Sequence, residues 1–171
     1  KNEDLLSEKK VKGEKIEFNY PDQYEFPPKK ENFFFDAEAF FYMDGYLYLF
    51  TKSDVVGQFG KTKMYKIPST KGSHEAEFVS EFNAGTTRDY RITSASISPN
   101  KKKVALLTHN KILLFTNFSS DNFFKGDLKQ IDLKHTSQKE GITFENNETL
   151  YLTDEKNKEG GGNLYIYTLK D

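Results

Sequence analysis

The sequence predicts an all-β protein made of repeated units, each with about four short antiparallel strands. Three segments share one pattern, in which a small residue and an apolar strand precede a tight polar turn and a second apolar strand. These segments are 38–49, 94–107 and 140–152. A β-rich pattern that recurs about every 50 residues is typical of a β-propeller or a similar array of sheets. No segment shows helical periodicity, which favours an all-β chain further.

The composition agrees with this fold class and excludes some functions. Aromatic residues make up 15% of the 171 residues, with 16 Phe and 10 Tyr, and such side chains suit half-buried strands. The net charge is −1, so no overall positive field attracts nucleic acid. Cysteine is absent, which removes disulfides and thiolate chemistry. No apolar run is long enough for a transmembrane helix, so we expect no transmembrane segment.

The first unit spans about residues 33–83. Its strands are expected at 37–43, 46–52, 62–67 and 76–82. Asp44-Gly45 predicts a two-residue hairpin turn, because both turn positions need positive φ. Pro68 to Gly72 is expected to form a turn.

Two further units follow, at about 90–133 and 139–169. The expected strands of the second unit are 92–98, 104–109, 111–117 and 128–133, and those of the third are 141–144, 150–153 and 163–169. Segment 15–20 alternates polar and apolar residues, and we expect it to be a strand of a preceding unit.

The units do not make a complete ring. About three units and one spare strand are present, whereas propellers typically have about four to eight blades. We therefore expect a partial domain over 1–171, part of a six-bladed ring. Its partners would be upstream propeller blades missing from this chain, or a second chain that completes the ring.

One polar position recurs just before the small residue and is occupied by Glu38, Ser94 and Glu140. In a propeller, equivalent positions on the innermost strands form a ring around the central channel. Carboxylates that converge there can hold a hard cation such as calcium, so Glu38 and Glu140 are candidate metal ligands. Asp36, on the same face of the strand as Glu38, and Asp154 with Glu155 are candidates to assist. Alternatively, these carboxylates solvate the channel mouth or pair with cations.

Three cations are candidates for that pairing: Lys52, Arg88 and Arg91. Lys52 occupies the place in the first unit that Glu155 occupies in the third, which predicts a lysine–carboxylate pairing between units. A strand-end lysine is also a common solvated edge residue. No histidine spacing indicates a metal site and no serine lies in a nucleophile-elbow pattern, so the catalytic residues are unknown.

The aromatic runs 33–35 and 40–42 have two interpretations. They are candidates for a platform on which a sugar or a base stacks. The alternative is core packing. Alternation places Phe40 and Tyr42 on one face and Phe41 and Met43 on the other, and both faces are buried in a stack of blades.

The motif residues resemble a family of secreted propeller proteins and lipoproteins of Bacteroidetes-type bacteria. The resemblance rests on segments 35–40, 46–52, 65–68, 92–99 and 140–142. It implies an extracellular, periplasmic or outer-membrane-anchored protein with further blades before this segment. More distantly, the pattern is similar to phytase-like and gluconolactonase-like six-bladed propellers, which bind calcium through acidic residues at the channel mouth. Glu38, Glu140 and Asp154 match such positions, whereas Ser94 departs from them.

Two main functions remain open. The first is a binding or scaffold module for an unknown small ligand or protein at the channel mouth. The candidate ligand-binding residues are Asp36, Glu38, Lys52, Arg91, Ser94, Glu140, Asp154 and Glu155. The second is a calcium-dependent hydrolase of the phytase-like or lactonase-like kind. A third possibility is that unfinished sheet edges bind another protein by strand addition.

Overall fold

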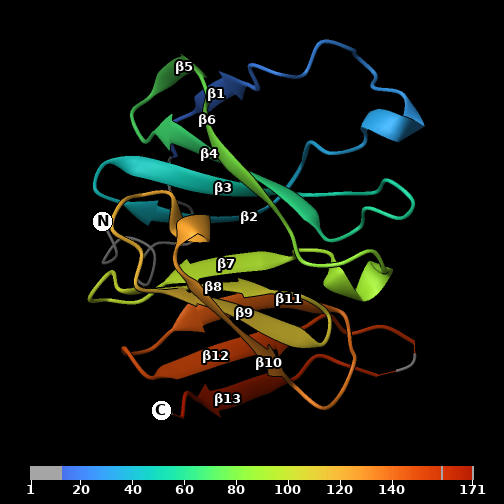
Figure 1. Ribbon diagram of the computed structural model, residues 1–171, viewed down its shortest axis with the longest axis vertical. Coiled ribbons are helices and arrows are strands. Elements are labelled where there is room, and N and C mark those ends of the chain that lie inside the picture. Colours follow the sequence, from blue (N-terminus) through green and yellow to red (C-terminus); the bar gives the residue numbers. More distant parts are fainter. Residues whose placement is uncertain (1–12, 159, 171) are drawn as a thin grey trace.

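The chain folds into a stack of β-sheets. The computed structural model describes residues 13–158 and 160–170, and its strands form three antiparallel sheets and one small parallel pair. The sheets follow one another along the long axis of the molecule (Figure 1). In that part of the chain the helices are three-residue 3₁₀ turns, η1 (Lys30–Asn32), η2 (Arg88–Tyr90) and η3 (Phe123–Lys125), and no helix is long and apolar enough to cross a membrane.

The first sheet contains the four strands expected for the first unit. They are β2 (Asp36–Met43), β3 (Tyr46–Lys52), β4 (Lys61–Pro68) and β6 (Glu77–Asn83), hydrogen-bonded in that order. Asp44 and Gly45 join β2 to β3 with φ values of 51° and 88°, so the predicted hairpin turn is confirmed.

The second and third sheets have the same meandering order. The second contains β7 (Ser94–Ile97), β8 (Lys103–Leu107), β9 (Lys111–Thr116) and β10 (Asp127–Asp132), and the third contains β11 (Lys139–Phe144), β12 (Thr149–Asp154) and β13 (Leu164–Thr168). Each of these strands was predicted to within a few residues.

The parallel pair differs from the expectation. Strand β1 (Ile16–Asn19) was expected to belong to a preceding unit, but it pairs with β5 (Gly72–Glu75), which lies between β4 and β6 in the chain. The sequence of β5 has no apolar alternation, so it gave no strand signal and its first residue was assigned to a turn. The apolar side chains of the pair come from β1, whose Ile16 and Phe18 pack over the outer face of the first sheet.

The first strands of the three sheets lie next to one another, with β7 between β2 and β11. The hydroxyls of Ser94 and Ser96 accept hydrogen bonds from the backbone nitrogens of Ile142, at 3.2 Å, and Phe144, at 3.1 Å. On the other side of β7, Ala95 packs in one buried cluster with Ala39 of β2. The recurring small residue is therefore explained by the close approach of these strands.

Aromatic rings fill the space between the first two sheets. Phe123 of η3 is 1% exposed, and its ring centroid lies 5.2 Å from that of Tyr48 and 5.6 Å from that of Phe41. Its neighbour Phe124 contacts the ring of Phe115 on the second sheet at 5.3 Å. η3 thus inserts two rings between the sheets. The core between the second and third sheets is mainly aliphatic.

The expectation that both faces of β2 are buried was wrong. Phe41 is 7% exposed, but Phe40 and Tyr42 on the opposite face are 62% and 60% exposed. Their cross-strand partners, Leu49 and Leu47, pack in the cluster that β1 covers. Strand β1 thus covers β3 and β4 on this side of the sheet, and the same face of β2 remains exposed to solvent.

We predict that Phe123→Ala lowers the free energy of unfolding by about 3–5 kcal/mol, because it removes a fully buried ring and leaves a cavity. Val56→Ala, at a residue that is 84% exposed, is the matched control and should change it by less than about 0.5 kcal/mol. Urea denaturation measures both values. Equal losses in the two variants would contradict this account of the core.

Candidate functional site

Two β-bulges lie near the first residues of β2 and β11, on the side of the stack where these two strands begin. In β2 the register against β3 shifts between Ala37 and Ala39, so Glu38 is the extra residue. In β11 the register against β12 shifts between Lys139 and Gly141, so Glu140 is the extra residue. A bulge bends its strand and redirects a side chain. The two glutamates therefore occupy equivalent places in the first and third sheets.

Glu38 forms an ion pair with Lys52, the last residue of β3. The Lys52 Nζ atom also lies 3.3 Å from the Asp36 carboxylate. Partial burial alone would lower the pKa of Lys52, but the hydrogen bond to Glu38 and the charges of both carboxylates outweigh it and raise this pKa. Lys52 is therefore held as a cation between two acidic side chains of its own sheet.

Glu140 lies in an acidic environment. Desolvation of its carboxyl group raises its pKa, and the negative charges of Glu38 and Glu155 raise it further, whereas Lys52 opposes them. Much of the residue nevertheless remains open to solvent. Among the residues that the structure describes, neither Glu140 nor Glu155 has an ion-pair partner within 4.0 Å. Negative charge is therefore left unneutralised between the first and third sheets.

Ser94 does not occupy the place of the two glutamates. It pairs with Leu107, whose side chain packs toward the third sheet, and its hydroxyl reaches β11. Ser94 therefore faces the next sheet along the chain, as Ala39 does in the first sheet. Since side chains alternate along a strand, Ser94 corresponds to Ala39, and to Gly141 in the third sheet, rather than to the glutamates. Thr93 then corresponds to Glu38 and Glu140, and its hydroxyl donates to the Lys139 carbonyl at 2.6 Å. The pairing of β7 with β8 is regular from Ser94 to Ile97, and Thr93 lies just before it, with its backbone nitrogen donating to the Leu107 carbonyl at 3.0 Å. Matching the sequences therefore placed the second unit one residue out of step.

Arg91 lies beside this cluster, just before β7. It forms an ion pair with Asp54, and its guanidinium stands 4.8 Å from the centroid of the Phe59 ring. Its Nε atom is buried without a hydrogen-bond partner among the described residues. Burial lowers the pKa of the nearby His109, and the charge of Arg91 lowers it further, so the imidazole favours its neutral form.

Asp154 lines a polar cavity at the end of β12, which borders the acidic cluster through Glu155. The cavity has a volume of about 330 Å³ and is also lined by Glu155, Ser137 and Tyr165. The Asp154 carboxylate accepts hydrogen bonds from the Asn163 backbone and from the Tyr165 hydroxyl, both at 2.7 Å. These bonds hold the pKa of Asp154 well below its usual range. Asp154 therefore orders the loop that follows it.

A buried lysine near this cavity was not predicted. Lys139 is 1% exposed, and its Nζ donates to Ser137 Oγ at 2.9 Å and to the carbonyls of His109 and His135 at 3.1 and 3.3 Å. Burial lowers its pKa, and the charge of Asp154 opposes this. Lys139 thus fastens two loops together. Nothing in the sequence separates it from the many exposed lysines.

The structure brings together five of the predicted side chains, Asp36, Glu38, Lys52, Glu140 and Glu155. Arg91 lies at their border, whereas Ser94 and Asp154 serve the scaffold. Asp54 and His109 were not predicted, because they follow strand ends in loops without a motif. Among the described residues, no group of three His, Asp or Glu side chains is placed to hold a metal ion.

No protein-family model matches the chain, and no curated protein matches it.

We predict that Glu140→Gln stabilises the protein at neutral pH and has little effect near pH 4. The pKa of Glu140 is raised in the folded chain, so its contribution to stability is complete below the unfolded-state pKa and is lost as the pH rises through the folded pKa. Glutamine does not ionise, so the variant does not lose this stability as the pH rises. Thermal unfolding across this pH range measures the difference between variant and parent. A gain in the thermal stability of the variant that is constant with pH, or largest at acid pH, would contradict the prediction.

Proposed function

We propose that this chain is part of an exported β-propeller and acts as a binding module. In this proposal it holds a cationic group of a partner at the end where β2, β7 and β11 begin. The observation that carries the proposal is the pair of matched bulges, which places Glu38 and Glu140 at the same end of the first and third sheets.

The arrangement of the sheets supports the propeller part of the proposal. Each antiparallel sheet is a meander whose first strand lies beside the first strand of the next sheet. Neighbouring sheets pack face to face through continuous buried clusters. Radially arranged blades have this relation, because their first strands converge on a common axis.

The charges at the first-strand end support a cationic ligand. Lys52 is already neutralised by Glu38 and Asp36, and Arg91 is neutralised by Asp54. The carboxylates of Glu140 and Glu155 are then in excess. Desolvation raises the pKa of Glu140, and repulsion from the charges of Glu38 and Glu155 raises it further, although Lys52 opposes them. An ammonium or guanidinium group that entered would relieve this repulsion, whereas an anion would increase it.

Calcium-dependent hydrolysis receives no such support. Calcium takes about six to eight oxygen ligands, and the described residues offer no cluster of three acidic side chains suited to a metal. Glu38, one of the two candidate ligands, is engaged by Lys52. We therefore treat calcium binding as an outcome of the test.

The test uses a fluorescently labelled oligolysine peptide as the probe and measures its binding by fluorescence anisotropy. We expect saturable binding that weakens with added salt. Glu140→Gln and Glu155→Gln should each weaken it about two- to fivefold, as expected for the loss of one partly exposed charge pair. Glu17→Gln removes the same charge from β1, which lies over the outer face of the first sheet, and serves as the control.

Equal weakening by Glu17→Gln would show attraction to the overall charge and would overturn the proposed site. Absence of binding at low salt would overturn it as well. Calorimetry with calcium chloride provides the other arm. Tight calcium binding that is lost in Glu38→Gln and Glu140→Gln would favour the hydrolase over the binding module.

A further inference from the structure

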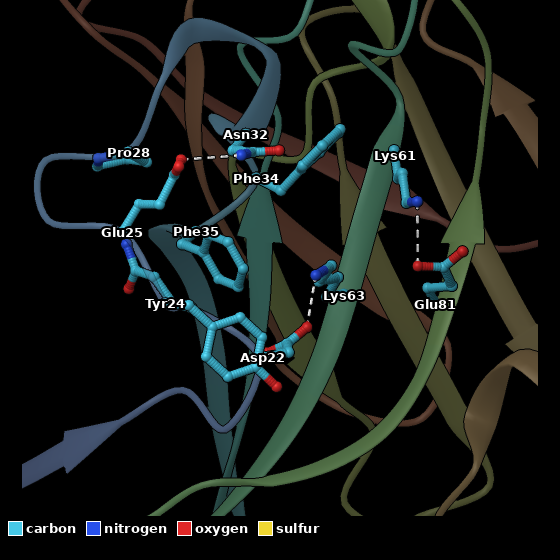
Figure 2. A pocket seen from close by; sticks show the side chains of 11 residues that line it. Asp22, Tyr24, Glu25, Pro28, Asn32, Phe34, Phe35, Lys61, Lys63 and Glu81 are labelled. Carbon is cyan, nitrogen blue, oxygen red and sulfur yellow. Dashed lines mark hydrogen bonds and ion pairs between the residues drawn. The ribbon is translucent and has the colours of Figure 1, made fainter.

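A second cavity opens beneath the loop that joins β1 to β2. Its volume is about 450 Å³, within the range of small-molecule sites. Figure 2 shows residues of the loop, among them Tyr24, Asn32 and Phe34, facing Lys61 and Lys63 of β4 and Glu81 of β6. The cavity lies between two parts of the chain that are distant in sequence.

The charged groups around this cavity neutralise one another. Lys63 Nζ lies 2.5 Å from the Asp22 carboxylate, and Lys61 Nζ lies 3.1 Å from that of Glu81. Figure 2 marks both pairs. The Asp22 carboxylate also accepts the Tyr65 hydroxyl at 2.7 Å. Burial opposes ionisation of Asp22, but its bonds to Lys63 and Tyr65 prevail and lower its pKa.

The third carboxylate of the cavity is engaged as well. Glu25 accepts a hydrogen bond from the Asn32 amide at 3.1 Å and pairs with Lys29 at 3.2 Å. A charged ligand would therefore have to break an existing pair. A neutral ligand with many hydroxyl groups would not, because a hydroxyl both donates to a carboxylate and accepts from an ammonium or amide group.

Aromatic rings form the apolar part of the cavity. The faces of Phe34 and Phe35 are approached by the lysine ammonium groups, with Lys61 5.1 Å from the Phe34 centroid and Lys63 4.4 Å from the Phe35 centroid. Tyr24 is different, because its side chain lines the cavity and is 85% exposed. A large exposed aromatic ring beside hydrogen-bonding groups is a surface on which the C–H face of a sugar ring can pack.

We infer that this cavity binds a neutral saccharide, with Tyr24 as the stacking ring and Asn32, Glu25 and the paired lysines as hydrogen-bonding partners. Sequence alone offered a sugar or base platform in the runs 33–35 and 40–42 as an alternative to core packing. In the structure Phe34 and Phe35 are partly covered, and the exposed residues of the second run, Phe40 and Tyr42, do not line this cavity. The exposed ring that lines it is Tyr24, which belongs to neither run. This inference does not depend on the cationic site at the first-strand end.

Ligand-observed NMR with cellobiose, maltose, methyl α-mannoside and N-acetylglucosamine tests the inference. Glucose 6-phosphate and glucosamine serve as the anionic and cationic comparators. We expect at least one neutral sugar to bind at millimolar concentrations more tightly than its charged comparators. Tyr24→Ala should weaken that binding about tenfold, as expected for the loss of one well-packed aromatic contact.

The control is Tyr42→Ala, because Tyr42 is also a largely exposed tyrosine, 60% exposed, but does not line the cavity. It should leave sugar binding unchanged. Thermal unfolding of both variants shows whether the fold is kept, and Asn32→Ala gives a second variant in the loop that lines the cavity. The inference is overturned if no neutral sugar binds, if a charged comparator binds more tightly, or if Tyr24→Ala and Tyr42→Ala have equal effects. None of these outcomes involves the oligolysine probe, so the two proposals fail separately.

Discussion

The close approach of β2, β7 and β11 determines how the three antiparallel sheets pack against one another. Three strands from three different sheets lie side by side at the centre of the stack, without the backbone ladder that joins strands within one sheet. Small side chains make this approach possible, and the hydroxyls of Ser94 and Ser96 provide acceptors for two β11 nitrogens. Buried backbone donors need such partners. A larger apolar residue at either serine would remove the acceptor and occupy the space.

The same constraint explains the bulges and the charges near them. Where β2 and β11 enter the stack, each has one extra residue opposite its neighbour, and in both cases this residue is a glutamate. One glutamate has a lysine partner in its own sheet and the other has none among the described residues. The two bulges thus place one paired and one unpaired glutamate on the same side of the stack. The resulting excess of negative charge supports the proposed cationic ligand.

Much of this fold could be predicted from the sequence, because its strongest signals are local. The Asp44-Gly45 turn follows from the φ values that a tight hairpin needs, and the strands follow from alternation. The unpredicted features depend on tertiary contacts. Strand β5 has no apolar pattern and exists because β1 pairs with it. The depth at which Phe123 is buried follows from the position of η3 between two sheets.

The candidate site was predictable in part for the same reason. Glu38 and Glu140 were recognised from the repeat, and their equivalence survives in the structure. Ser94 was aligned with them because sequence spacing does not reveal which residue of the second unit lies just before its paired strand, and in the structure that residue is Thr93. Lys139 and the cavity beside Tyr24 depend on loop conformations that no short pattern encodes. Loops carry much of the binding chemistry that we propose for this chain, as is common in β-sheet scaffolds.

The pKa of Glu140 reports whether the two bulged glutamates share one electrostatic environment. NMR titration of this carboxyl group in the parent protein and in Glu38→Gln gives the value in each. The account predicts a pKa above that of an ordinary glutamate in the parent and a lower value in the variant, since the substitution removes a like charge. A pKa of Glu140 that does not change when Glu38 becomes glutamine would contradict it.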